Sequence, residues 1–204
     1  LKPVVPATDP GNGGWIVRND LLLEARILGT QLPMMYDFLR PYLETNKVYD
    51  VQSASLVDFD YLDAQEIFRT YYELTRDHGS RNSNWSALMA TCMLQNLLAL
   101  SDPVERAAAL KIYLTTGSDR QASLSYDYRH YQEAGNVWPE SLQYANEVVT
   151  IRSTHMVLLE RYDPTLKLFD TYPNYVMSLP RLSYLRFPNR DLVSFGDGPR
   201  PAEA

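Results

Sequence analysis

Apolar residues recur at helical spacing along most of the chain, from residue 21 to about residue 180. The clearest pattern begins after Asp60, a residue type that caps helix N-termini, and ends at Gly79. Its apolar positions recur at intervals of three and four: Tyr61, Ala64, Ile67, Phe68, Tyr71, Tyr72 and Leu74. The next stretch, residues 83–100, is apolar on nearly all sides and predicts a helix buried between neighbours. These patterns favour an all-α fold.

Glycine, proline and capping residues divide the rest of the chain into further helices. The first predicted helix follows Asn19 and Asp20 and ends at Gly29. Further boundaries are expected at Pro33 (start), Pro41 (break or kink), Asp102–Pro103 (start), Gly117 (end), Asp119 (start), Gly135 (end), Pro139 (start), Asp163–Pro164 (start) and Pro180 (end). The short connections predict antiparallel helical hairpins. In series these hairpins fit an α/α toroid, which six or seven helices would leave incomplete.

The pattern changes after Pro180. The segments "LSYLRF" and "DLVSFG" alternate apolar and polar residues around "PNR", which predicts a short β-hairpin or extended segment near the C-terminus. Leucine at position 1 and the final "GDGPRPAEA" indicate an internal piece of a longer precursor.

Composition narrows the classes of function. The 204 residues carry a formal net charge of −6 and no dense lysine or arginine run, which argues against general nucleic-acid binding. No apolar run is long enough to span a membrane. The single cysteine, Cys92, lies in an apolar helical pattern and is expected to be a buried small hydrophobe.

The stretch "SYDYRHYQE" carries the first candidate chemistry. His130 and Glu133 are three residues apart, so on a helix they share one face. Alone, this spacing is more typical of a solvated helix face than of a site. Arg129 and Trp138 nearby add an anion-pairing group and a stacking face, although such aromatic residues also fill gaps between helices.

A second candidate group lies in "GSRNSNW", where Arg81, Asn82, Asn84 and Trp85 stand at a predicted helix start. Free backbone N–H groups and the positive end of the helix dipole favour anions there. Ordinary capping by Ser83 or Asn84 explains the same residues equally well.

"GSRNSNW", "YRHYQEAGNVWPESLQY", "YLRFPN" and "FGDGPR", in this order and spacing, resemble the toroid domain of heparinase II and related heparinase II/III-type polysaccharide lyases. The resemblance covers roughly residues 79–200. It implies a bacterial secreted or periplasmic enzyme that cleaves uronic-acid glycans, such as heparin or heparan sulfate, by β-elimination. Residues 1–204 would then be part of the catalytic toroid, and a β-sheet domain would follow outside this chain.

The resemblance also implies roles for single residues. His130 and Glu133 match a helix-borne catalytic pair, and Tyr184 matches an acid/base tyrosine. A protonated Glu133 would neutralise the uronate carboxylate, which makes the neighbouring C–H acidic enough to lose its proton. Tyr184 would protonate the leaving oxygen, helped by a cation from Arg186 or Arg190, and His130 would act as base for one uronate epimer.

The remaining assignments are to binding and positioning. Glu140 and Tyr144 are expected to orient the catalytic pair and shape the cleft. The family's further histidine and metal ligands lie in the β-sheet domain, so we expect no metal site in this chain and a divalent metal such as zinc, if any, in that domain. The expected partners are an acidic polysaccharide, the rest of the polypeptide and, as one option, a second copy of the chain.

Two alternatives stay open. A glycoside hydrolase on the same helical ring would use an acid and a base from Asp127, Glu133 and Glu140. A non-catalytic helical module would bind acidic glycans without turnover. Arginines that could meet such a glycan are Arg81, Arg129, Arg152, Arg186 and Arg190.

Overall fold

A computed structural model describes residues 21–50, 53–133, 137–191 and 193. The described chain is mostly helical, as the apolar spacing predicts. Its elements are α1 (Leu21–Leu23), the π-helical η2 (Glu24–Gly29), α2 (Leu32–Leu43), β1 (Val48–Asp50), β2 (Ser55–Val57), α3 (Tyr61–His78), α4 (Trp85–Ala99), α5 (Pro103–Lys111), the π-helical η3 (Ile112–Thr116), α6 (Leu124–Glu133), α7 (Leu142–Tyr162), the 3-10 turn η4 (Pro164–Leu166), α8 (Leu168–Thr171) and α9 (Pro173–Tyr184). None of these helices combines the length and apolar character that crossing a bilayer requires.

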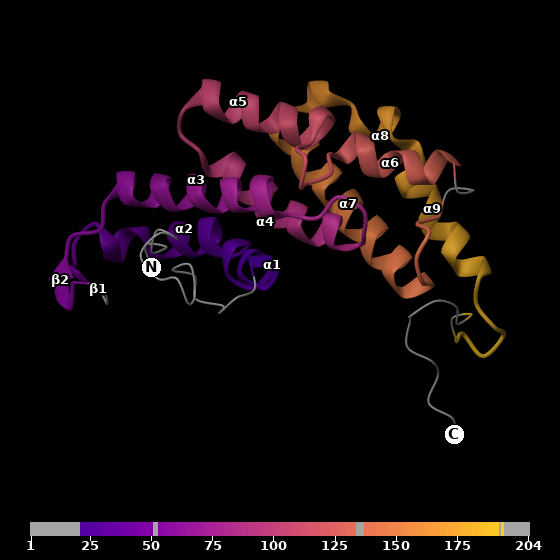
Figure 1. The fold of residues 1–204 in the computed structure, drawn as a ribbon, viewed down its shortest axis with the longest axis horizontal. Helices are drawn as coiled ribbons and strands as arrows, with labels where there is room; N and C mark the ends of the chain where they lie inside the picture. The colour runs from indigo at the N-terminus through magenta and orange to yellow at the C-terminus, as the bar shows by residue number, and fades with distance from the viewer. Residues whose placement is uncertain (1–20, 51–52, 134–136, 192, 194–204) are drawn as a thin grey trace.

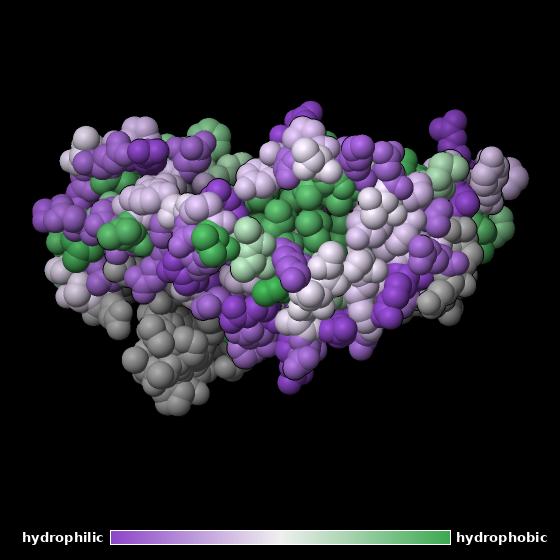
Figure 2. All heavy atoms as spheres, turned by 90° about the horizontal axis from the view of Figure 1, so that it is seen from above, coloured by the Kyte–Doolittle hydropathy of each residue, from purple (hydrophilic) through white to green (hydrophobic). Residues whose placement is uncertain are grey.

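The helices form an open, elongated array (Figure 1). The β1–β2 hairpin, α2 and α3 lie at one end, and α6, α8 and α9 lie at the other, with α7 crossing towards the middle. Hydrophilic side chains dominate both ends of the face that carries α5, and apolar side chains gather towards its middle (Figure 2). Each helix of this array therefore packs mainly against its immediate neighbours.

The helix α3 begins and ends where local signals place it. The Asp60 side chain accepts from the backbone N–H groups of Leu62 and Asp63, and the Asp63 side chain accepts from the Asp60 N–H, which completes a capping box. The predicted end at Gly79 is the C-cap. Similarly, Asp102 caps α5. These boundaries are confirmed because capping depends on neighbouring residues alone.

The helices α3 and α4 form an antiparallel hairpin around the core. Gln65, in the first turns of α3, donates to the carbonyl of Ala99 at the end of α4 (3.0 Å) and accepts from the Ser101 N–H (2.7 Å). Ten residues of α4 are buried, which confirms a helix enclosed on nearly all sides. The core then runs on from α4 into α7, α9 and α6.

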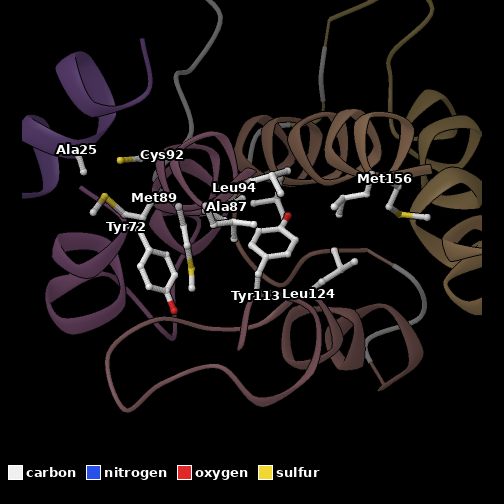
Figure 3. Close-up of a cluster of buried hydrophobic side chains, with 14 of the residues drawn as sticks. Ala25, Tyr72, Ala87, Met89, Cys92, Leu94, Tyr113, Leu124 and Met156 are labelled. Atoms are coloured by element: carbon white, nitrogen blue, oxygen red, sulfur yellow. The ribbon is translucent and has the colours of Figure 1, made fainter. Parts of the chain in front are cut away.

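Figure 3 shows side chains from separate helices meeting in this core, among them Met89, Leu94, Tyr113 and Met156. Cys92 is fully buried there, and burial raises the pKa of its thiol to about 12. It is the buried small hydrophobe that its neighbours in the sequence predict.

Four boundaries differ from the sequence prediction. The helix α6 begins at Leu124, five residues after the predicted start at Asp119. Pro180 lies inside α9, which continues to Tyr184, so the predicted end at Pro180 is wrong. The helix predicted to start at Pro139 is α7. It begins three residues later, at Leu142, with Ser141 as its N-cap. The predicted helix after Pro164 is divided into η4, α8 and α9. Lys167, in a left-handed conformation (φ 45°), separates η4 from α8, and Tyr172, which is non-helical and precedes Pro173, separates α8 from α9.

The structure also has a hairpin that the sequence analysis missed. The strands β1 and β2 pair antiparallel, with Val48 opposite Val57. The hairpin or extended segment predicted around "PNR" near the C-terminus is confirmed as a short hairpin. Phe187 N donates to Asp191 O (2.8 Å) and Val193 N to Leu185 O (3.0 Å) on either side of a turn, in which Arg190 N donates to Phe187 O (2.8 Å). That segment begins after Tyr184, several residues later than predicted.

Candidate functional site

Tyr126 of α6 joins the two candidate groups that the sequence placed 44 residues apart. Its hydroxyl donates to the Asn82 side-chain oxygen (3.0 Å). The Arg81 guanidinium lies 4.4 Å from the centre of the Tyr126 ring, and the Arg129 guanidinium lies 4.0 Å from it. The fold therefore gathers Arg81, Asn82 and Arg129 around one aromatic ring.

His130 lies one turn further along α6, in contact with two aromatic rings. Its ring centre is 4.8 Å from that of Trp138 and 6.4 Å from that of Tyr126, both edge to face. Trp138 is 2% exposed, and its indole N–H donates to Glu140 Oε2 (2.5 Å). Trp138 is thus a buried support for His130 and offers no open stacking face.

Glu140 connects this support to the start of α4. The same oxygen, Oε2, accepts the backbone N–H of Asn84 (2.8 Å), which is the N-cap residue of α4. Neither Ser83 nor Asn84 caps the helix through its own side chain. The helix start is therefore already occupied by a carboxylate of the protein, and the sequence-based expectation of a free anion site at the Asn84 N–H is wrong.

Asn84 and Trp85 point towards other parts of the fold. The Asn84 amide donates weakly to Glu147 of α7 (3.4 Å), and Asn84 is 7% exposed. The Arg26 guanidinium of η2 lies 5.5 Å from the Trp85 ring centre and 4.0 Å from Glu147. The start of α4 is thus tied to η2 and to α7 at once.

The catalytic pair and the tyrosine remain separate in the described contacts. Glu133 is the last residue of α6, and its side chain lies outside the described part of the structure. Tyr184 is the last residue of α9 and is 86% exposed. No hydrogen bond or ring contact among the described residues joins Tyr184 to His130 or to Tyr126. The strand position expected for Tyr184 is wrong, because α9 continues through it.

Arg186 and Arg190 lie on the turn that follows Tyr184. Arg186 Nη1 donates to the carbonyl oxygen of Arg190 (3.0 Å), which has a positive φ of 74°. Both side chains are exposed. Tyr144, in the first turn of α7, is half-buried, and its backbone N–H donates to Ser141 Oγ (3.4 Å). The roles of these residues stay predictions.

A buried polar network lies behind the cluster, and the sequence analysis missed it. Asp127 and Arg152 are both 0% exposed and form an ion pair, with Arg152 Nε 3.0 Å from Asp127 Oδ2. Ser86 Oγ donates to the same carboxylate oxygen (2.6 Å), and Arg152 also donates to the Tyr113 hydroxyl (3.3 Å). Burial is the largest single influence and opposes the charged guanidinium, but the Asp127 carboxylate together with Tyr113 and Tyr175 raises the pKa of Arg152 overall.

This network corrects two expectations. Arg152 cannot meet a glycan, and Asp127 cannot flank a glycosidic bond as a hydrolytic acid or base, because both face the core. Helical spacing could have predicted this burial. Asp127 follows Leu124 by three residues and Arg152 follows Val148 by four, so each charged residue lies on the apolar face of its helix.

His155 completes the network as a packed residue of α7. Its Nδ1 lies 2.8 Å from the Tyr113 hydroxyl and its Nε2 lies 3.0 Å from Thr91 Oγ1. Burial, together with the charge of Arg152, holds the pKa of His155 well below its ordinary value. A neutral histidine held by two hydroxyl groups belongs to the core.

A hollow of about 540 Å³ lies at the other end of the molecule and contains none of the predicted site residues. Its lining residues are Tyr36, Leu43, Glu44, Thr45, Asn46, Lys47, Asp58, Phe59, Asp60 and Tyr61. Most of its charged groups already have partners: Lys47 pairs with Asp58 (3.2 Å) and Glu44 with Arg40 (2.7 Å). Within the described ranges, no group of three or more His, Cys, Asp or Glu side chains could hold a metal ion.

Residues 134–204 match the family model of the endo-acting ulvan lyase 2nd domain. The matched stretch is about a third of the chain and includes Trp138, Glu140, Tyr144, Tyr184, Arg186 and Arg190. The matched family is one of polysaccharide lyases, as the sequence indicates, and it is not heparinase II. No curated protein and no solved structure matches the chain.

Proposed function

We propose that this chain is part of a polysaccharide lyase that cleaves ulvan, a uronic-acid polysaccharide, by β-elimination. The observation that carries the proposal is the cluster on α6. There His130 contacts Tyr126, whose ring carries the guanidinium groups of Arg81 and Arg129. His130 also contacts Trp138, which is bonded to Glu140, and these two residues belong to the segment that matches an ulvan lyase domain. The match replaces a heparin-like glycan with ulvan as the proposed substrate.

The proposed chemistry removes a proton from the carbon next to the uronate carboxylate. His130 accepts this proton, the C–H electron pair forms a carbon–carbon double bond, and the glycosidic C–O bond at the neighbouring carbon breaks. Tyr184 protonates the leaving oxygen. A protonated Glu133 hydrogen-bonds the uronate carboxylate and stabilises the negative charge that develops on it.

The structure places the side chains of His130 and Tyr184 in different environments. His130 is half-buried and held by two rings, so it is oriented before substrate arrives. Tyr184 is exposed on the last turn of α9, so the sugar itself would have to bring it into the reaction. Accordingly, we propose that the glycan lies across α6 and the end of α9.

The hydrolase alternative is weakened because two of its candidate carboxylates, those of Asp127 and Glu140, already have partners within the protein. Asp127 is buried in an ion pair with Arg152. Glu140 already accepts from Trp138 and from the Asn84 N–H through one oxygen. A hydrolase needs two carboxyl groups on opposite sides of the glycosidic bond, and two of its three candidates, Asp127 and Glu140, are committed in this way.

The same proposal covers the domain organisation and the localisation of the enzyme. We propose that residues 1–204 are part of an α/α-toroid catalytic domain, that a β-sheet domain of the same polypeptide completes the site, and that the enzyme acts in the periplasm or outside the cell. Any metal would be held by that second domain.

The test is to incubate ulvan with the full polypeptide that carries this chain and to follow ultraviolet absorbance. Elimination leaves a conjugated unsaturated uronate that absorbs, whereas hydrolysis leaves only new reducing ends. His130→Gln, Glu133→Gln and Tyr184→Phe should each lower the rate at least about 100-fold, which is the usual loss when a proton-transferring group is removed. The matched control is Tyr49→Phe, which changes an exposed residue of β1, at the end of the molecule away from the cluster.

Each outcome decides between the alternatives. Reducing ends without unsaturated product would identify a hydrolase. Binding of ulvan without any cleavage, unchanged by the three substitutions, would identify a non-catalytic module. Full activity of Tyr184→Phe would remove the phenol from the mechanism.

A further inference from the structure

We propose that Arg81, Arg129 and Asn82, organised by Tyr126, form a binding subsite for an oxyanion carried by the polysaccharide, in addition to the uronate carboxylate that Glu133 hydrogen-bonds in the proposed reaction. The oxyanion is a sulfate ester or a second carboxylate. The proposal rests on the proposed function only in taking a polysaccharide as the ligand, because the recognition chemistry requires no turnover.

Two guanidinium groups share one aromatic ring in this subsite. Arg81 and Arg129 come from different segments, and both lie within 4.4 Å of the Tyr126 ring centre. Each contact with the ring is favourable, since the ring face is electronegative, but the two positive charges repel each other. A bound anion between or beside them would offset that repulsion.

Neither guanidinium forms an ion pair with a described carboxylate. Five other arginines do have acidic partners: Arg26, Arg40, Arg69, Arg76 and Arg152. Further described arginines, such as Arg106 and Arg161, also lack one, but among the described residues Arg81 and Arg129 are the two whose guanidinium groups share one aromatic ring. In a chain with a net charge of −6, two such cations on one ring are a local exception. Arginine suits oxyanions because its fork of N–H donors matches two oxygen atoms at once.

The subsite is partly organised before any ligand binds. Arg81 Nη1 donates to the carbonyl oxygen of Ser118, which fixes the half-buried side chain against the turn before α6. The Tyr126 hydroxyl donates to Asn82 Oδ1 (3.0 Å), which leaves the Asn82 amide N–H groups as donors at an exposed position. Arg129 is exposed and can adjust to the ligand.

The position of the subsite links it to the proposed reaction centre. Tyr126 and His130 are four residues apart on α6, which is about 6 Å along a helix, and their ring centres are 6.4 Å apart. An anion held at Tyr126 and a sugar held at His130 can therefore belong to the same or to adjacent units of one polysaccharide chain.

The test is calorimetric binding of three polymers to the full polypeptide: ulvan, chemically desulfated ulvan and carboxyl-reduced ulvan. Arg81→Gln and Arg129→Gln should each weaken ulvan binding about 10-fold, and Tyr126→Leu should weaken it at least as much because both guanidinium groups lose their platform. Tyr126→Phe keeps the ring and should cost less. The control is Arg161→Gln, which removes the same charge at an exposed position of α7.

The identity of the oxyanion follows from which polymer cancels the effect. If the arginine substitutions no longer matter with desulfated ulvan, the subsite binds sulfate; if they no longer matter with carboxyl-reduced ulvan, it binds a carboxylate. Affinities of the Arg81→Gln and Arg129→Gln variants equal to that of the unsubstituted protein would overturn the proposal. So would an equal loss in Arg161→Gln, since the effect would then be one of net charge.

The result is separable from that of the lyase test. Arginine-dependent binding without unsaturated product would keep the subsite and remove the lyase. Unsaturated product with arginine-independent binding would do the reverse. The Tyr126→Phe variant removes one hydroxyl only, so it keeps the test decisive if a larger change disturbs folding.

Discussion

Removing the carboxylate of Asp127 should destabilise the protein strongly, because Arg152 would be left charged and without its acidic partner in the core. Both side chains are 0% exposed, and Arg152 would retain only Ser86 Oγ (3.1 Å) and the Tyr113 hydroxyl (3.3 Å) as hydrogen-bond partners. Breaking a buried ion pair by deleting one partner costs about 3–5 kcal/mol. For a chain of this size, Asp127→Ala should therefore lower Tm by roughly 6–20 °C.

A double substitution separates the pair from its surroundings. Asp127→Leu combined with Arg152→Met removes both charges and replaces them with apolar groups, which is often neutral or stabilising. The loss of the acceptor for Ser86 should leave a residual cost of about 1–2 kcal/mol. The double variant should thus be more stable than either single variant, with a coupling energy of about 2 kcal/mol or more.

The assay is urea unfolding followed by circular dichroism, with the free energy of unfolding taken from linear extrapolation. Glu105→Ala is the matched control, since it breaks the partly exposed pair with Arg69 and should cost no more than about 1 kcal/mol. The reasoning is refuted if Asp127→Ala stays within about 1 kcal/mol of the unsubstituted protein. It is refuted equally if the double variant loses the sum of the two single losses.

Two other predictions concern the same core. Lowering the pH from 6.5 to 5 should reduce the free energy of unfolding by about 2 kcal/mol, because His155 stays neutral when folded, its pKa being lowered by burial and by Arg152, whereas the unfolded chain takes up the proton. His155→Gln should flatten this part of the stability profile, and an unchanged slope would assign it to other groups. Gly117→Ala should cost about 1–3 kcal/mol in thermal unfolding, because φ is +63° and the added Cβ would lie 2.8 Å from the Gln121 carbonyl oxygen; an unaltered Tm would mean that the turn rearranges.

Helix boundaries could be predicted where the deciding contacts are local. Asp60 and Asp102 cap the helices that follow them through their own side chains, within three residues. The helix end predicted at Pro180 is wrong because the prediction considered only that proline lacks a backbone N–H and that its ring crowds the preceding turn. The burial of Tyr175, Ser178 and Leu182 on one face of α9 carries the helix past it.

The sequence predicts many of the residues that make up the candidate site, but it does not predict which of them contact one another. Helical spacing is enough to place Tyr126 and His130 one turn apart on α6. The bonds from Tyr126 to Asn82 and from Glu140 to Asn84 span 44 and 56 residues, and no local pattern specifies them. Arg152 was assigned to the surface because charge was counted without asking which face of its helix carried it.

The cap on α4 has a consequence for biosynthesis. The carboxylate that closes the first turn of α4 belongs to Glu140, 56 positions downstream. On the ribosome, where the N-terminal part of a chain emerges first, that turn stays open until the start of α7 has also left the exit tunnel. Fragments that stop short of residue 140 should therefore fray at the beginning of α4, whatever the helical propensity of its sequence.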